Sequence, residues 1–197
     1  WWFEDNKKSD PVAKPPKVKE PLYIKSNGAV KESDYTTHRV NFLEHSDFVI
    51  KKLSLPWNKH CLKERYGIGV RNNQDEMQLV FRINNHHIKR HKGQQFGNAE
   101  CKIYPDIANI DPKGTLLICE GEKDAVSAGC YGFPAISFTS GANGIPKDLT
   151  ILDEYKNIVI CYDNDESGKK GAKKLANNLF NIDREIKILT LPDEMDI

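Results

Sequence analysis

The chain has 197 residues, of which 39% are hydrophobic and 29% charged, as is typical of globular proteins. No apolar run approaches the ~18–20 residues needed to cross a bilayer, and no hydrophobic N-terminal segment resembles a secretion signal. We therefore expect no contact with a membrane. The five cysteines have no CxxC spacing, so neither a disulfide framework nor a zinc ribbon is indicated.

Charge is divided unevenly along the chain. Residues 1–97 contain 18 Lys and Arg against 11 Asp and Glu, a net charge of +7, whereas residues 98–197 contain 11 against 17, a net charge of −6. A basic half joined to an acidic half suggests a polyanion-binding surface beside a metal-binding site. Chance clustering of solvated surface charge is the alternative.

The first 36 residues combine several prolines with many lysines, which predicts an extended, flexible linker. Residues 37–110 follow as a mixed α+β subdomain. Its apolar spacing over 37–65 predicts two helices separated by Pro56, and residues 78–83 and 86–92 predict two strands of a hairpin. This hairpin is rich in positive charge, from Arg82, Lys89, Arg90 and Lys92.

Residues 111–197 alternate apolar strands with helices. Strands are expected at 116–119, 135–138, 158–161 and 186–189, and helices near 122–131, 146–155 and 168–181. Buried strands separated by helices pair in parallel through right-handed crossovers. The predicted fold class is therefore α/β, with a small doubly wound parallel sheet.

The two most apolar strands run directly into acidic residues. Glu120 follows the first, and Asp163 and Asp165 follow the second. The carboxyl ends of parallel strands meet at one edge of the sheet, where ligands bind, so these carboxylates are expected to hold Mg²⁺. The alternative is that such acids only cap the following helices, a role that we expect of Glu122 and Glu166.

These residues resemble the TOPRIM domain of primases, topoisomerases and some nucleases. The signature is Glu120-Gly121 followed by Asp163-Asn164-Asp165, and residues 120–124, 137–144, 163–168 and 191–196 are similar to the primase version. Upstream, residues 64–69, the basic hairpin and residues 101–105 look like the basic subdomain that precedes TOPRIM in bacterial and phage primases. The resemblance covers about residues 37–197. The zinc ribbon and the helicase of such primases lie outside it, which fits a fragment of a longer protein.

The resemblance implies a primase core that synthesises short RNA primers from NTPs on single-stranded DNA with Mg²⁺ or Mn²⁺ and without zinc. It implies catalysis by Glu120, Asp163 and Asp165, with Asp124 and Asp196 contributing to metal binding. The residues expected to bind template or NTP phosphates are Arg65, Arg82, Lys89, Arg90 and Lys92. A replicative helicase, fused or associated, is the expected protein partner, in the cytoplasm of a bacterial, phage or plasmid replication system.

Other functions use similar patterns. A TOPRIM nuclease would use the same acids with water as the nucleophile, although the basic half argues against it. A topoisomerase would need a catalytic tyrosine in a further domain. A phosphatase of the haloacid dehalogenase type would need a lysine and an acid beyond Asp165, where only 32 residues follow. A non-catalytic nucleic-acid-binding module would keep the fold as a scaffold.

Overall fold

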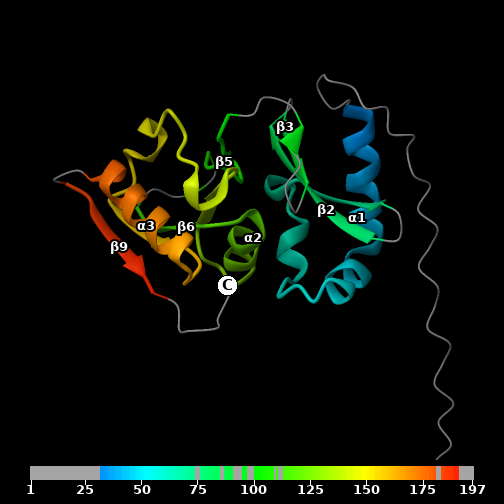
Figure 1. Cartoon of the computed structure of the whole chain (residues 1–197). Coiled ribbons are helices and arrows are strands. Elements are labelled where there is room, and N and C mark those ends of the chain that lie inside the picture. The colour runs from blue at the N-terminus through cyan, green and yellow to red at the C-terminus, as the bar shows by residue number, and fades with distance from the viewer. Residues whose placement is uncertain are drawn as a thin grey trace, which may run out of the picture.

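The computed structural model describes residues 32–73, 76–84, 87–90, 95–96, 100–108, 110, 113–180 and 183–190. Within these ranges the side chains of residues 32–34, 72–73, 76, 84, 87–90 and 95–96 are not described. The predicted linker therefore lies almost entirely outside the described residues. Two sheets, one of four and one of five strands, organise the rest, and they lie on opposite sides of helix α2 in Figure 1.

The N-terminal part consists of helix α1 and an antiparallel sheet. Helix α1 spans Glu32–Lys52 and bends at His45; its buried side chains include Tyr35, Phe42 and Val49, which repeat every seven residues and so share one face. The sheet has the order β1-β2-β3-β4. Its strands are β1 (Ile68–Asn73), β2 (Glu76–Asn84), β3 (His87–Arg90) and β4 (Gln95–Phe96).

Two details of this part differ from the sequence-based expectation. Helix α1 begins at Glu32, inside the segment predicted to be linker. The helix expected after Pro56 is replaced by two short 3₁₀ helices, η1 (Lys59–Leu62) and η2 (Glu64–Tyr66). Asn58 caps η1 by accepting the His60 N–H at 2.8 Å, and Gly67 ends η2 in a left-handed conformation, which glycine tolerates. These local bonds divide the predicted helix.

The second sheet has the order β5-β7-β6-β8-β9. Strands β6 (Thr115–Cys119), β7 (Ala135–Phe138), β8 (Asn157–Cys161) and β9 (Glu185–Leu189) are parallel, and β5 (Ile103–Tyr104) pairs antiparallel with β7. Helix α2 (Glu122–Cys130) follows β6, and α3 (Glu166–Leu179) follows β8. The α/β fold with a doubly wound sheet is thus confirmed, and β5 adds residues 103–104 to it.

Alternate residues of β6 pack against the two helices on opposite faces of the sheet. Leu116 and Ile118 share a core with Ala172 and Leu175 of α3. Cys119 packs instead with the alanines of α2. The helix expected over 146–155 is only a 3₁₀ turn, η4 (Thr150–Leu152), which follows a tight bend in which Asp148 accepts the Thr150 N–H at 2.9 Å.

Helix α2 joins the two parts of the chain. Trp57 Nε1 donates to Ser127 Oγ at 3.0 Å, and Asn58 Nδ2 donates to the Cys130 carbonyl at 2.8 Å. A Cβ on Gly129 would lie 1.9 Å from the Tyr66 hydroxyl, so only glycine permits this close approach. Because these side chains are shared between the parts, the basic subdomain is held in a fixed position against the second sheet.

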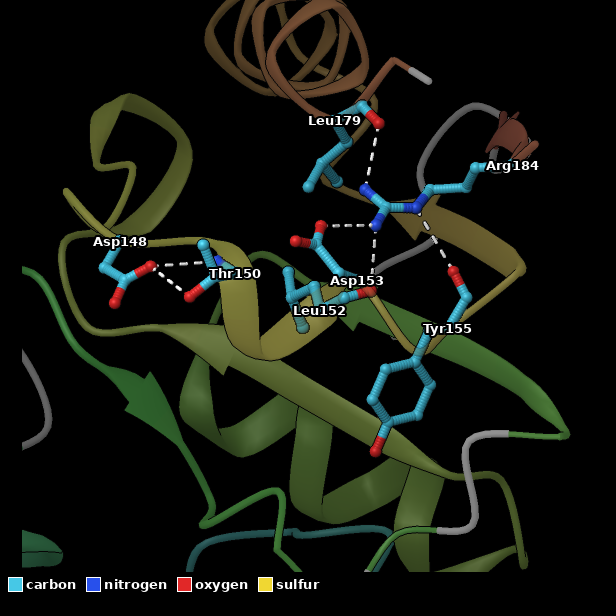
Figure 2. Close-up of polar contacts among 7 residues, drawn as sticks. All are labelled: Asp148, Thr150, Leu152, Asp153, Tyr155, Leu179 and Arg184. Carbon is cyan, nitrogen blue, oxygen red and sulfur yellow. Dashed lines mark hydrogen bonds and ion pairs between the residues drawn. The ribbon is translucent and has the colours of Figure 1, made fainter. Parts of the chain in front are cut away.

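Arg184 connects the segments around the start of β8. Its guanidinium donates to three backbone carbonyls, of Leu152, Tyr155 and Leu179, at 3.0, 3.2 and 2.9 Å, and pairs with Asp153 at 3.0 Å (Figure 2). The Arg184 side chain is only 6% exposed, and a planar guanidinium satisfies several acceptors at once. This cluster fixes the edge of the sheet remote from the acidic residues.

Among the described helices, none combines the length and apolar character that crossing a bilayer would require. The five cysteines are free thiols, and Cys119 and Cys161 are buried at paired positions of β6 and β8. Burial raises the pKa of the Cys161 thiol to about 11, so both behave as small apolar side chains.

Candidate active site

Glu120 and Asp163 lie at the point where the chain winding reverses. Strand β6 is followed through α2 by β7 on one side of it, and its neighbour β8 is followed through α3 by β9 on the other. Cys119 and Cys161, the last residues of β6 and β8, are paired in register. The residues that follow them therefore face one crevice at the carboxyl edge, where open α/β sheets bind ligands.

The Glu120 carboxylate accepts hydrogen bonds across this crevice. Its Oε2 atom accepts the Asp163 N–H at 3.2 Å, and the backbone N–H of Ala142 also donates to the carboxylate. Burial raises the pKa of Glu120, and the negative charges of Asp163 and Asp165 raise it further. Glu120 is thus held by the chain after β8 and the loop after β7, and it is close to two other acids.

Asp124 lies beside these acids, in the first turn of α2. Its Oδ2 atom accepts the Gly121 N–H at 3.0 Å. Burial, followed by the negative charge of Asp163, raises the pKa of Asp124 to about 7. Asp124 therefore has the helix-capping role that we expected of Glu122, whose side chain is buried in the first turn.

Asp165 is exposed and is the N-cap of α3. Its Oδ1 atom accepts the Gly168 N–H at 2.6 Å, so the capping role expected of Glu166 belongs to Asp165. A carboxylate offers about four acceptor positions, and one hydrogen bond leaves capacity for a cation. Asp163 is half-buried, and its backbone N–H bonds Glu120.

Gly168 is a site residue that the sequence analysis quoted in a motif without giving it a role. A Cβ at this position would lie 2.1 Å from the Asp163 carbonyl oxygen and 3.0 Å from Glu120 Oε2. The first turn of α3 therefore packs directly on the two acids. The signal was available in the spacing Asp163-Asn164-Asp165-Glu166-Ser167-Gly168, because a glycine where a helix begins often permits a close backbone approach.

The donor set fits a hard divalent cation. Its side-chain donors are carboxylates, which suit Mg²⁺ or Mn²⁺. The pKa values of Glu120 and Asp124 are raised first by burial and then by neighbouring negative charge, and a cation would relieve that repulsion. Within the described part of the chain, no three acids, histidines or cysteines converge as a preformed metal cage. Such a cation would therefore need water or substrate oxygens to complete its shell.

We expect Asp124→Asn to alter the dependence of stability on pH in metal-free buffer. The Asp124 carboxyl ionises near its ordinary pKa of 3.8 in the unfolded chain but near 7 in the native protein. Stability is therefore lost as pH rises between these values. The asparagine oxygen still accepts the Gly121 N–H, so the variant should be more stable than wild type by about 1–3 kcal/mol at pH 8 and nearly equal to it at pH 4.

Urea unfolding with EDTA at both pH values measures this difference. Equal stabilities of the variant and the wild type at pH 8 would show that neither burial nor neighbouring charge raises the pKa of Asp124. Adding Mg²⁺ at pH 8 should stabilise the wild type more than Asp124→Asn if the cation binds beside this residue.

The basic residues named from the sequence are only partly described. The Arg65 guanidinium lies 4.8 Å from the centre of the Tyr66 ring, and that of Arg82 lies 4.9 Å from the centre of the Tyr35 ring. Both guanidinium groups therefore already pack against an aromatic ring of the protein. Lys89 and Arg90 belong to β3, but their side chains are not described. Lys92 and Asp196 lie outside the described residues. The expectation that these cations bind template or NTP phosphates stays a prediction.

Lys102 is a cation at the acidic edge that sequence reasoning did not single out. Thr139, directly after β7, donates its N–H to the Lys102 carbonyl at 2.9 Å, which places Lys102 at the carboxyl end of that strand. Its ammonium and that of Lys147 pair with Glu100 at 2.9 and 3.3 Å. These residues line a pocket of about 500 Å³ beside β5, and Ile83 of β2 also lines it. The signal for Lys102 was available in the sequence, because it belongs to residues 101–105, which resemble part of the basic subdomain of primases.

Comparison with known proteins agrees with this geometry. Residues 117–197 match a family described as Toprim-like. The chain is 26% identical over 162 residues to the DNA primase of Thermotoga maritima, covering 66% of this chain and 29% of that protein. It is 31% identical over 87 residues to the DNA primase of Geobacillus stearothermophilus, covering 44% and 15%. It is 28% identical over 96 residues to the Gene 57 protein of Mycobacterium phage D29, covering 49% of this chain and 60% of that protein.

Solved structures extend the likeness to the N-terminal part. The E. coli primase catalytic core superposes with a TM-score of 0.60 at 16% identity, covering 84% of this chain and 72% of that one. The primase fragment of the bacteriophage T7 primase-helicase superposes with a TM-score of 0.54 at 18% identity, covering 68% of this chain and 61% of that one. Residues 117–197 are thus similar in sequence to the Toprim-like family, and the chain has the fold of primase catalytic cores. The resemblance seen in the sequence is confirmed.

Proposed function

We propose that this chain is the catalytic core of a DNA primase, which synthesises short RNA primers from NTPs on a single-stranded DNA template. The observation that carries the proposal is the hydrogen bond from Asp163 to Glu120 across the crevice between β6 and β8. It brings a strand-end glutamate and the Asp163–Asp165 pair together. The fold shared with primase cores supports the choice of reaction.

Each acid has a distinct role in this proposal. Asp163 and Asp165 hold Mg²⁺ or Mn²⁺, and Asp124 and Asp196 contribute to further metal binding. A cation bound there would supply positive charge to neutralise the phosphates of the incoming nucleotide. Glu120 completes the metal site or accepts the proton of the attacking 3′-hydroxyl, and its raised pKa makes it a better proton acceptor than an ordinary glutamate.

The basic subdomain supplies the contacts to phosphates. Arginine and lysine side chains position a nucleic acid through its backbone without reading its sequence. The proposed contacts are Arg65, Arg82, Lys89, Arg90 and Lys92, to which the structure suggests adding Lys102. All six lie within residues 60–105, so we expect this part of the chain to provide most of the affinity for single-stranded DNA. That affinity should fall steeply with salt, because phosphate contacts release counterions.

The proposed partners follow from the proposed reaction. The chain spans 60% of the length of the phage relative and less than a third of the two primases that it matches. A replicative helicase, fused or associated, is the proposed protein partner, and the proposed location is the cytoplasm in which a bacterial, phage or plasmid replicon is copied.

A synthesis assay tests the function directly. The chain is incubated with single-stranded DNA, labelled NTPs and Mg²⁺ or Mn²⁺, and the products are separated by size. Short labelled oligomers that require both the template and the metal are expected. Cleavage of the input DNA without synthesis would instead favour a nuclease, and DNA binding with neither reaction would favour a non-catalytic module.

We expect the double variant Asp163→Ala/Asp165→Ala to lose divalent metal binding. Calorimetric titration with Mn²⁺ should show at least about a tenfold weaker affinity, since both proposed carboxylate ligands are removed. The matched control is Glu154→Ala, which removes an exposed acid just before β8, at the opposite edge of the sheet. Unchanged Mn²⁺ affinity in the double variant would reject the metal site.

A further inference from the structure

A turn at the edge opposite the acids exposes two aromatic side chains. Tyr131 and Phe133 follow α2 and are 69% and 58% exposed. They precede β7, so they lie at the amino edge of the parallel strands, whereas Glu120 and Asp163 follow strands at the carboxyl edge. Single exposed apolar residues are common, but two large rings separated by one residue are an unusual surface feature.

The turn is held in place by backbone hydrogen bonds. Tyr131 N–H donates to the Ala128 carbonyl at 3.1 Å, Gly132 N–H to Gly129 at 3.1 Å, and Phe133 N–H to Ala128 at 3.1 Å. Gly132 has a φ of +90°, which glycine adopts without strain. The backbone carrying the two rings is thus pre-organised, which lowers the entropic cost of binding a partner.

Positive charge gathers beside this turn. The Asn58 side chain donates to the Cys130 carbonyl at 2.8 Å, which places η1 next to Tyr131. In and after η1 are Lys59 and Lys63, both exposed, and His60. Burial and the neighbouring charges of Lys63 and Arg65 lower the pKa of His60, in agreement with a local excess of cations.

Two acids occur near the same helices. Glu64 is 83% exposed and pairs with the buried Arg39 at 3.4 Å, so its charge is partly balanced within the protein. Asp47 lies near Cys61 on the α1 side. Lys59 and Lys63 remain exposed to solvent in and after η1, which the Asn58 hydrogen bond places next to the turn. The surface therefore has the character of a site for a polyanion that carries planar groups.

We propose that Tyr131 and Phe133, together with Lys59 and Lys63, form a binding surface for single-stranded DNA outside the catalytic crevice. Bases stack on aromatic rings irrespective of sequence, and lysines contact the backbone phosphates. The choice of a single strand rests on the proposed function, but the surface does not depend on the acids or on metal. A template strand held here lies across the sheet from the reaction site, so the contact retains the template and takes no part in chemistry.

The test compares two probes by fluorescence anisotropy in EDTA. One is an oligothymidylate, and the other is an abasic oligonucleotide of the same length and charge. Tyr131→Ala/Phe133→Ala should weaken oligothymidylate binding at least about tenfold, since stacking contributes strongly for each base, and should leave the weaker abasic binding unchanged. Lys59→Ala/Lys63→Ala should weaken the binding of both probes and reduce the salt dependence of the affinity.

The matched control is Phe180→Ala, which removes a ring that is 79% exposed at the end of α3, where the last turn carries no basic residue. It should bind both probes as wild type does. Wild-type affinity of both double variants for oligothymidylate would overturn the proposal and leave the surface as a face for a protein partner. So would failure of the wild type to bind oligothymidylate. Neither result bears on metal binding by Asp163 and Asp165, which calorimetry measures separately.

Discussion

Replacing Glu120 with glutamine is expected to reduce primer synthesis at least about 100-fold, the usual contribution of a positioned acid or base. The glutamine side-chain oxygen can still accept the Asp163 N–H that now bonds Oε2 of the carboxylate. The change therefore removes the charge and keeps the shape. Both proposed roles of Glu120, metal ligand and proton acceptor, require that charge.

The two roles predict different secondary effects of Glu120→Gln. If Glu120 is a metal ligand, the Mn²⁺ affinity falls together with the rate, whereas a proton acceptor leaves the affinity unchanged. Binding of single-stranded DNA without metal should be as tight as in wild type, because the basic residues are unaltered. A rate of dinucleotide formation equal to wild type would contradict any role of Glu120 in the reaction.

Replacing Gly168 with alanine is expected to impair both folding stability and activity. The new Cβ would lie 2.1 Å from the Asp163 carbonyl oxygen, a backbone atom that cannot rotate away. Overpacking of this kind costs about 1–3 kcal/mol, which outweighs the gain of up to about 1 kcal/mol from exchanging glycine for alanine in a helix. A displacement of α3 also moves Asp165 and Asp163 relative to Glu120, and misplacement by about 1 Å can lower a rate on the order of 100-fold.

The control for this variant is Ser167→Ala, at the preceding exposed position of the same helix turn. It should retain wild-type activity, with a free energy of unfolding within about 0.5 kcal/mol of wild type. Urea unfolding and the synthesis assay measure both variants. If Gly168→Ala were as stable and as active as wild type, the close packing of α3 on the acids would have no functional importance.

The sequence by itself determined the nature of the second sheet. The apolar runs that became β6 and β8 contain no charged residue, so each had to be buried on both faces, and the intervening helices required parallel pairing. Once that pairing was fixed, the residues after the two strands had to share one edge. The position of Glu120 and Asp163 at this edge could therefore be predicted from the sequence without coordinates.

Short-range hydrogen bonds were harder to predict from the sequence. The apolar spacing through residues 57–62 and the strand–helix alternation after β7 predicted helices where η1 and η4 occur. Asn58 and Asp148 instead bond nearby backbone N–H groups and favour turns. Side-chain hydrogen bonds to nearby backbone N–H groups also decided which acids cap α2 and α3. Whether Asp165 or Glu166 caps α3 depends on one residue of helix phase, and boundaries of this kind are set by the packing of the helix as a whole.

Only the tertiary structure decided how the acids interact and where the two halves meet. The raised pKa of Asp124 depends on burial beside Asp163, a residue 39 positions away in the sequence, and no local pattern encodes that distance. Likewise, Gly129 is an ordinary helix residue until Tyr66 packs against it. The sequence determined which residues follow the strands because strand pairing obeys general rules, whereas these contacts depend on how particular side chains fill a shared core.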